Sequence, residues 1–184
     1  MDAEKDAFLK AYKDNYAKVL AYLYILTADQ SLAEDLAQET FLRAYKAIGD
    51  VKDELCLTAW LIKVGHNIFL DHVRKKSSKE VAVDNAELQN VLRVEGTLAA
   101  QVEKRIMSEC IQSKLLLVPE NYRAVLYLDS QGYSNQDIAG ILNCSLANVK
   151  IRLHRGRQKL KEILGNACSF YYDERNVMCC SPKD

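Results

Sequence analysis

Two prolines and seven glycines are all that interrupt the 184 residues of this chain. An all-β protein needs many more turn residues, so their scarcity argues against a sandwich or a barrel. Long stretches are filled instead by Ala, Leu, Glu, Lys and Gln, which are strong helix formers. We therefore expect an all-α fold.

Long apolar runs are also lacking, since none approaches the roughly 20 residues that a membrane-spanning helix needs. The first residues, Met1 to Asp6, lack the basic start and apolar stretch of a secretory signal. These absences predict a cytoplasmic protein without membrane insertion. Its six cysteines are then expected to be thiols or metal ligands rather than structural disulfides.

Signs of catalytic chemistry are equally scarce. The chain has no glycine-rich loop that would hold a phosphate. Its three histidines, which show no spacing typical of a metal pair or a nucleophile with its base, are His66, His72 and His154. We therefore predict a protein that is not an enzyme.

Net charge is absent as well, because 25 Lys and Arg balance 25 Asp and Glu. The balance conceals two opposite patches. Residues 146–161 hold six Lys or Arg and no acid, whereas residues 29–39 hold four acids and no base. A basic and an acidic surface on one chain predict two different partners.

Apolar residues at three- and four-residue steps predict three helices that can close an N-terminal bundle, at residues 4–26, 31–48 and 57–76. Ser31 is a suitable N-cap for the second of them, with Glu34 placed for a capping box. The expected organisation is an N-terminal domain, a linker, a C-terminal helix-turn-helix domain and a cysteine-containing tail, at residues 1–76, 77–112, 113–164 and 165–184.

The helix-turn-helix is predicted between Ser134 and Lys161. Ser134 and Ser145 are suitable N-caps, and Asn143 tolerates the left-handed backbone of a tight turn. In the second helix, one apolar side about 60° wide is expected to face the core. Its members are Val149, Leu153, Gly156 and Leu160.

The opposite face of that helix carries hydrogen-bond donors along its centre and cationic side chains along both edges. Such a helix suits the major groove between two phosphate backbones. A solvated basic helix is the plain alternative, but the caps, the turn and the absence of acids together favour DNA. The residues predicted to contact DNA are Ala147, Lys150, Ile151, Arg152, His154, Arg155 and Arg157.

Both halves of the chain resemble extracytoplasmic-function (ECF) sigma factors, the minimal two-domain type of bacterial sigma factor. Residues 117–120, 132–139 and 149–157 resemble the second domain of that family, and residues 33–41 and 60–67 resemble the first. Two matches in the right order and separation make the resemblance specific. It implies a factor that directs RNA polymerase core to promoter DNA, with the helix-turn-helix on the −35 element.

The resemblance also implies roles for the N-terminal domain. Residues on one side of the second helix would bind core polymerase, although most acidic helix faces are merely solvated: Asp35, Gln38 and Glu39. Residues of the third helix would contact the −10 element: Lys63, Asn67 and Arg74. An anti-sigma factor is a candidate further partner. Because the chain departs from the family pattern at 147–148 and 151, its −35 sequence is not predictable.

The tail holds half of the cysteines, on either side of a predicted hairpin that turns near residues 173–176. These thiols, Cys168, Cys179 and Cys180, are a candidate site for Zn²⁺ or Cu⁺ with a fourth ligand from elsewhere. Some members of the family have similar cysteine-rich extensions that sense metals. A redox-sensitive dithiol is the alternative, with Cys168 bonded to one of the other two, since adjacent cysteines rarely bond each other.

The remaining cysteines, Cys56, Cys110 and Cys144, lie within apolar patterns and are expected to be buried small hydrophobes. For the whole chain, the main alternative to a sigma factor is a stand-alone helix-turn-helix regulator that binds a palindromic site as a dimer. That alternative gives no role to the acidic helix or to the region of Asn67.

Overall fold

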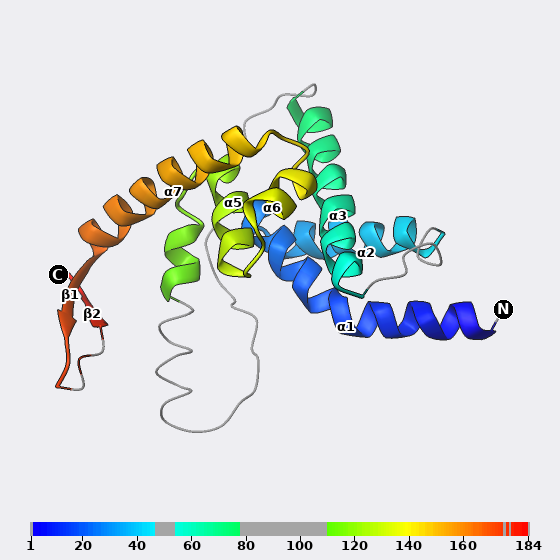
Figure 1. Cartoon of the computed structure of the whole chain (residues 1–184), viewed down its shortest axis with the longest axis horizontal. Coiled ribbons are helices and arrows are strands. Elements are labelled where there is room, and N and C mark those ends of the chain that lie inside the picture. Colours follow the sequence, from blue (N-terminus) through cyan, green and yellow to red (C-terminus); the bar gives the residue numbers. More distant parts are fainter. Residues whose placement is uncertain (1, 47–53, 78–109, 175, 177, 184) are drawn as a thin grey trace.

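Two groups of helices form the protein, one from each half of the chain (Figure 1). The N-terminal group is α1 (Asp2–Thr27), α2 (Gln30–Tyr45) and α3 (Glu54–Ser77). The C-terminal group is α5 (Glu120–Ser130), α6 (Asn135–Ile141) and α7 (Leu146–Ala167). Residues 110–115, ahead of α5, are also helical. The predicted all-α class with two helical domains is confirmed.

This computed structural model describes residues 2–46, 54–77, 110–174, 176 and 178–183. Most of the linker predicted at residues 77–112 lies outside the described residues, as does most of the loop before α3. Among the described helices, none combines the length and the apolar character needed to cross a membrane.

The turn between α1 and α2 is set by two consecutive residues. Ala28 has a left-handed backbone with φ of 54°. Asp29 then caps α2, because its carboxylate accepts a hydrogen bond from the Leu32 amide at 3.1 Å. The prediction that Ser31 is the N-cap is therefore wrong. Asp29 reaches the unpaired amides of the first turn, and Ser31 lies inside that turn.

The core of the N-terminal domain joins all three of its helices. Leu23 of α1, Phe41 of α2 and Leu61 of α3 are buried together. A polar bridge also ties α3 to α1, since the Thr58 hydroxyl donates to Asn15 Oδ1 at 2.5 Å. The Asn15 amide in turn donates to a backbone carbonyl of α1 at 2.9 Å. This buried amide is satisfied on both of its polar atoms, so its burial costs little.

Helices α6 and α7 form the predicted helix-turn-helix. Ser134 caps α6 in a reciprocal capping box with Asp137. Ser145 caps α7 by accepting a hydrogen bond from the Asn148 amide at 3.2 Å. Between the two helices, Asn143 has φ of 50°. The predicted caps and the predicted left-handed turn residue are all confirmed.

Helix α7 packs on α5 through the side that was predicted to face the core, where Val149, Leu153 and Gly156 are buried. The two helices approach most closely at Gly156. A Cβ atom added there would lie 3.1 Å from side-chain atoms of Leu126 and 3.2 Å from the Cβ of Tyr122. The absence of a side chain at this position therefore sets the spacing between α5 and α7.

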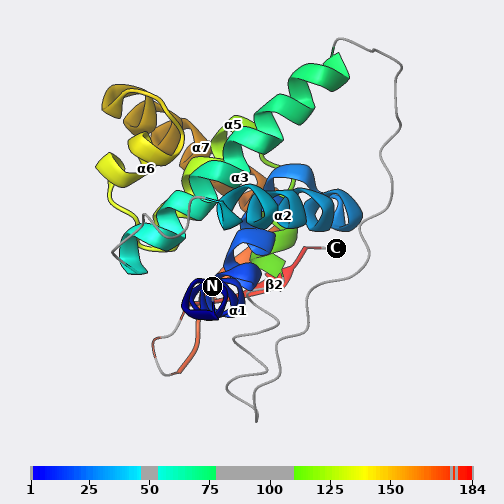
Figure 2. The same ribbon diagram turned by 90° about the vertical axis from the view of Figure 1, so that its right-hand side faces the viewer.

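The two domains pack against each other, with α1 against α5 and α3 against α6. Figure 2 shows α3 running between α2 and the C-terminal helices. At the centre of the junction, Tyr22 of α1 is fully buried. Its ring centroid lies 5.9 Å from that of Tyr127 on α5. The hydrophobic core is thus continuous from one domain to the other.

The predicted hairpin of the tail is present as an antiparallel pair, β1 (Cys168–Tyr172) and β2 (Met178–Pro182). It lies at the end of α7 that points away from the N-terminal domain (Figure 1). After β2, the Lys183 amide donates to the Ala167 carbonyl at 3.0 Å. The Lys183 ammonium donates to the Gly165 carbonyl at 2.6 Å. The segment after β2 therefore returns to the last turn of α7.

The close approach at Gly156 makes a testable prediction. We expect Gly156→Ala to be less stable than Gly140→Ala by about 1–3 kcal/mol, because only the first adds a methyl group to a filled space. At Gly140 in α6 nothing lies within 4 Å of an added Cβ. Gly140→Ala should therefore gain up to about 1 kcal/mol from helix propensity alone. Urea unfolding of the two variants gives the comparison, and equal gains in both would contradict the packing described.

Candidate nucleic-acid interface

The outward side of α7 presents most of the residues predicted to contact DNA. Six of the seven are exposed: Ala147, Lys150, Ile151, His154, Arg155 and Arg157. Ile151 is 51% exposed although its side chain is fully apolar. An apolar side chain in such a position suits contact with a thymine methyl group. The assignment of these residues to DNA remains a prediction.

Two of the predicted DNA contacts differ from the others in what they touch. Arg152 is half-buried and lies near α3, where its charge acts on His66. Arg157 forms an ion pair with Asp129 of α5 at 2.8 Å. This pair spans 28 positions of sequence, so no local pattern indicated it. In contrast, among the described residues neither Lys150 nor Arg155 makes an ion pair.

The residues predicted to contact the −10 element lie along α3. Asn67 is exposed one residue after the buried His66, and Lys63 is half-buried. Arg74 is exposed and pairs with Asp71 at 3.3 Å. It belongs to a basic last turn of α3, where cations also stabilise the negative end of the helix dipole. The structure thus places all three side chains on one helix, with only Arg74 of the three in its last turn.

The acidic face of α2 carries the residues predicted to bind polymerase. Asp35 and Gln38 are exposed, while Glu39 is half-buried and paired with Arg43 on the next turn. The same face continues to Leu42, which is 72% exposed. Sequence analysis did not single out Leu42, although its spacing from Asp35 and Gln38 places all three on one side of the helix. A single exposed leucine is common on protein surfaces, so only its position beside Asp35 and Gln38 connects Leu42 with the predicted polymerase-binding face.

A buried polar pair lies where the two domains meet. The Tyr22 hydroxyl and His66 Nδ1 share a hydrogen bond of 2.9 Å. Burial raises the pKa of Tyr22 well above its ordinary value, and the charge of Glu120 adds to the effect. Burial lowers the pKa of His66 to about 4, and Arg152 of α7 lowers it as well. Both groups are therefore neutral at pH 7.

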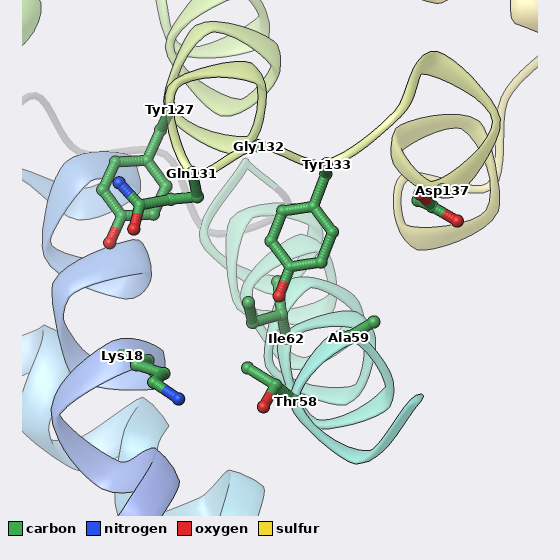
Figure 3. Close-up of a pocket in the computed structure, with 9 residues that line it drawn as sticks. All are labelled: Lys18, Thr58, Ala59, Ile62, Tyr127, Gln131, Gly132, Tyr133 and Asp137. Carbon is green, nitrogen blue, oxygen red and sulfur yellow. The ribbon is translucent and has the colours of Figure 1, made fainter. Parts of the chain in front are cut away.

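Beside this pair, a cavity of about 480 Å³ opens between the domains. Figure 3 shows side chains from α1 and α3 on one side of it and residues of α5 and the following turn on the other. Tyr133 points toward Ile62 and Thr58 of α3 in this view. The contact between the domains is thus a partial one, with a groove next to a closed core.

The register of the hairpin decides how the tail cysteines face. Cys168 pairs with Pro182 and Cys180 pairs with Phe170, whereas Cys179 pairs with Tyr171. Because successive residues of a strand point to opposite faces, Cys168 and Cys180 share one face and Cys179 lies on the other. Within the described part of the chain, no three His, Cys, Asp or Glu side chains are gathered as a metal site. Zinc or copper at these cysteines stays a prediction.

The other cysteines are not deeply buried. Cys110 and Cys144 are half-buried thiols, and the side chain of Cys56 lies outside the described residues. Cys110 lies close enough to Cys180 to help raise its pKa. Sequence analysis missed this proximity, because the two residues are separated by the whole C-terminal domain.

The chain matches two family models, Sigma-70 region 2 at residues 11–79 and Sigma-70, region 4 at residues 108–160. It is 32% identical over 174 residues to the ECF RNA polymerase sigma factor SigW of Bacillus subtilis (strain 168), covering 88% of this chain and 90% of that protein. It is 38% identical over 152 residues to the ECF RNA polymerase sigma factor SigM of the same organism, covering 79% of this chain and 87% of that protein.

Two solved structures have a similar fold. One is the sigma factor RpoE from Bartonella quintana, solved with the anti-sigma factor NepR, at a TM-score of 0.66 and 24% identity over 86% of this chain and 96% of that one. The other is CnrH, solved with the cytosolic domain of CnrY, at a TM-score of 0.58 and 21% identity over 88% of this chain and 89% of that one. At these identities the likeness extends to the fold alone.

The buried histidine predicts an acid-sensitive junction. The ordinary pKa of histidine is 6.5 and that of His66 in the folded protein is about 4. The unfolded chain therefore binds a proton first as the pH falls. The contribution of neutral, buried His66 to the free energy of unfolding is therefore complete above pH 6.5. It is lost as the pH falls from about 6.5 to 4. From pH 7 to pH 5 we expect wild type to lose about 2 kcal/mol more than His66→Gln in urea unfolding.

His154→Gln is the control for this experiment, because it removes an exposed histidine of α7. It should keep the pH dependence of the wild type. If His66→Gln also kept it, the junction would not be the acid-sensitive element.

Proposed function

The chain belongs to the sigma-70 family, in its extracytoplasmic-function group, and from this membership we propose how its surfaces divide the recognition of a promoter. As a sigma factor it binds the core of RNA polymerase and directs it to promoter DNA. In the proposed division, α7 binds the −35 element, α3 binds the −10 element and the acidic face of α2 binds core polymerase. A stand-alone dimeric regulator is not needed to explain any of these surfaces.

The observation that carries the proposal is the two-sided character of α7. One side is fixed on α5 by Val149, Leu153 and Gly156. The other side presents Lys150 and Arg155, which make no ion pair within the described residues. A rigid helix with unpaired cations on its outer side can enter a major groove without first breaking contacts of its own. Arg157 would reach a phosphate only by breaking its ion pair with Asp129. We therefore propose that it contributes less to DNA binding than Lys150 and Arg155 do.

For α2 we propose that Leu42 is the apolar centre of the polymerase-binding surface, with Asp35 and Gln38 at its edge. Protein interfaces commonly combine a buried apolar anchor with a polar rim. Leu42 is the most exposed large apolar side chain described, and none of the described residues of its own domain covers it. Burial against polymerase would remove that apolar surface from water.

The remaining parts of the proposed function concern setting and partners. We propose that the protein acts by binding rather than by catalysis, and that it works in the cytoplasm, where polymerase and promoters are found. Because RpoE was solved with the anti-sigma factor NepR, we include an anti-sigma factor among the proposed partners.

In vitro transcription tests the function directly. Core RNA polymerase and the full-length protein are incubated with sheared genomic DNA from the source organism, and the 5′ ends of the transcripts are mapped. We expect a set of start sites that requires the protein and shares two upstream elements. Failure of an active core polymerase to gain any protein-dependent start site would contradict the proposal.

Arg155→Ala tests the role of α7. Loss of one contact to a base edge should cost about 1–3 kcal/mol of promoter affinity for the holoenzyme, measured at fixed salt. Lys13→Ala removes the same charge from an exposed position on α1, and it should leave −35 binding unchanged. Equal effects of the two variants would mean that only overall charge matters.

Leu42→Ala tests the role of α2. We expect its affinity for core polymerase to fall about tenfold, which corresponds to about 1.4 kcal/mol of lost apolar contact. The stability of the free protein should not change, because the side chain is 72% exposed. Leu9→Ala truncates another exposed leucine, on α1, and serves as the control. Normal holoenzyme formation by Leu42→Ala would mean that polymerase binds a different surface of the protein.

A further inference from the structure

We propose that Cys168 and Cys180 form a reversible disulfide that fastens the C-terminal hairpin to the end of α7. This inference is independent of promoter and polymerase binding. It concerns two thiols for which the function described above has no use, and it selects one bond among those that the six cysteines allow.

The hairpin register brings these two cysteines together and excludes the third. Cys168 and Cys180 are diagonal neighbours on one face, since their direct partners are Pro182 and Phe170. The two thiols lie close enough for Cys168 to help raise the pKa of Cys180. Diagonal neighbours in a sheet lie about 7–8 Å apart at Cα, slightly beyond the usual span of a disulfide. A free two-stranded ribbon can twist enough to close that gap.

Cys179 differs from Cys180 although the two are adjacent in sequence. It lies opposite Tyr171, on the face of the hairpin that Cys168 does not share. A bond from Cys168 to Cys179 would require one strand to turn over. The register therefore distinguishes two cysteines that composition and spacing treat alike.

The position of the pair gives the bond a structural consequence. Cys168 is the C-cap of α7, and its amide donates to the Leu164 carbonyl. Helix α7 has no basic residue in its last turn, and Lys183 supplies a cation there from beyond β2. A bond from Cys168 to Cys180 would hold β2 in register, and with it the lysine that neutralises the negative end of the helix.

The reaction is a thiol–disulfide exchange with a low-molecular-weight disulfide such as glutathione disulfide. The Cys180 thiolate attacks one sulfur and releases one glutathione, because Cys180 is half-buried while Cys168 is buried. Cys168 then attacks the mixed disulfide and releases the second glutathione. One protein disulfide forms, one glutathione disulfide is reduced to two thiols, and the protein loses two electrons and two protons.

The environment of Cys180 affects how fast the disulfide forms, and the cellular compartment affects how long it lasts. Burial raises the pKa of Cys180, and the nearby Cys168 and Cys110 raise it further. Little thiolate is then present at neutral pH, so oxidation should be slow there and faster in more alkaline buffer. In a cytoplasmic protein a disulfide is usually transient, which fits a regulated bond better than a permanent one.

The test uses the full-length protein, first reduced and then incubated with glutathione disulfide. Remaining thiols are alkylated, and the protein is analysed by intact mass and by tryptic mapping. Cleavage after Arg175 separates Cys168 from Cys180, so the bond appears as two linked peptides. We expect wild type to lose two alkylatable thiols, to show this linked pair and to regain both thiols with excess reduced glutathione.

The adjacent cysteines supply matched variants. Cys179→Ser should form the linked pair as wild type does, whereas Cys180→Ser and Cys168→Ser should not. Cys110→Ser should also retain it, which excludes a bond from Cys110. Linkage that survives in Cys180→Ser but is lost in Cys179→Ser would overturn the proposal. So would persistent single glutathionylation, or Zn²⁺ or Cu⁺ binding by the reduced protein that depends equally on all three tail cysteines and blocks oxidation.

Discussion

The arrangement of the two domains depends on a buried hydrogen bond. Tyr22 and His66 belong to different helices of the N-terminal domain, and the ring of Tyr127 from the C-terminal domain lies against Tyr22. Either polar group, buried alone, would cost about 1–3 kcal/mol. Together they satisfy each other, and the apolar body of the tyrosine joins the two cores.

Neutral histidine is a condition of that arrangement. A proton on His66 would place a second positive charge near Arg152, inside a site that is already desolvated. The neutral state of His66 therefore avoids charge repulsion with Arg152 of α7. Arg152 is half-buried, whereas Arg155, one turn away on the same helix, is exposed. The seven residues of α7 that were predicted to form one DNA-binding surface therefore lie in at least two different environments.

What the sequence predicted correctly rests on local interactions. The caps at Ser134 and Ser145 and the turn at Asn143 each involve residues within one helical turn, and the buried side of α7 follows from its period alone. The error at Ser31 was also local, because Asp29 was an equally good cap two residues earlier. Nothing local indicated that Tyr22 meets His66, or that Arg157 meets Asp129. Those pairs depend on how helices pack, which periodicity does not encode.

The tail also combines features that the sequence predicts with a pairing that it does not predict. Its composition indicates a cluster of thiols, and its turn residues indicate a hairpin, but the chemistry depends on register. A shift of one residue in the pairing of β1 with β2 would place Cys179, rather than Cys180, on the face of Cys168. The hydrogen bonds from Lys183 to the last turn of α7 favour the observed register, because they fix where β2 ends. A lysine that carries no redox chemistry itself thus helps to determine which thiol faces Cys168.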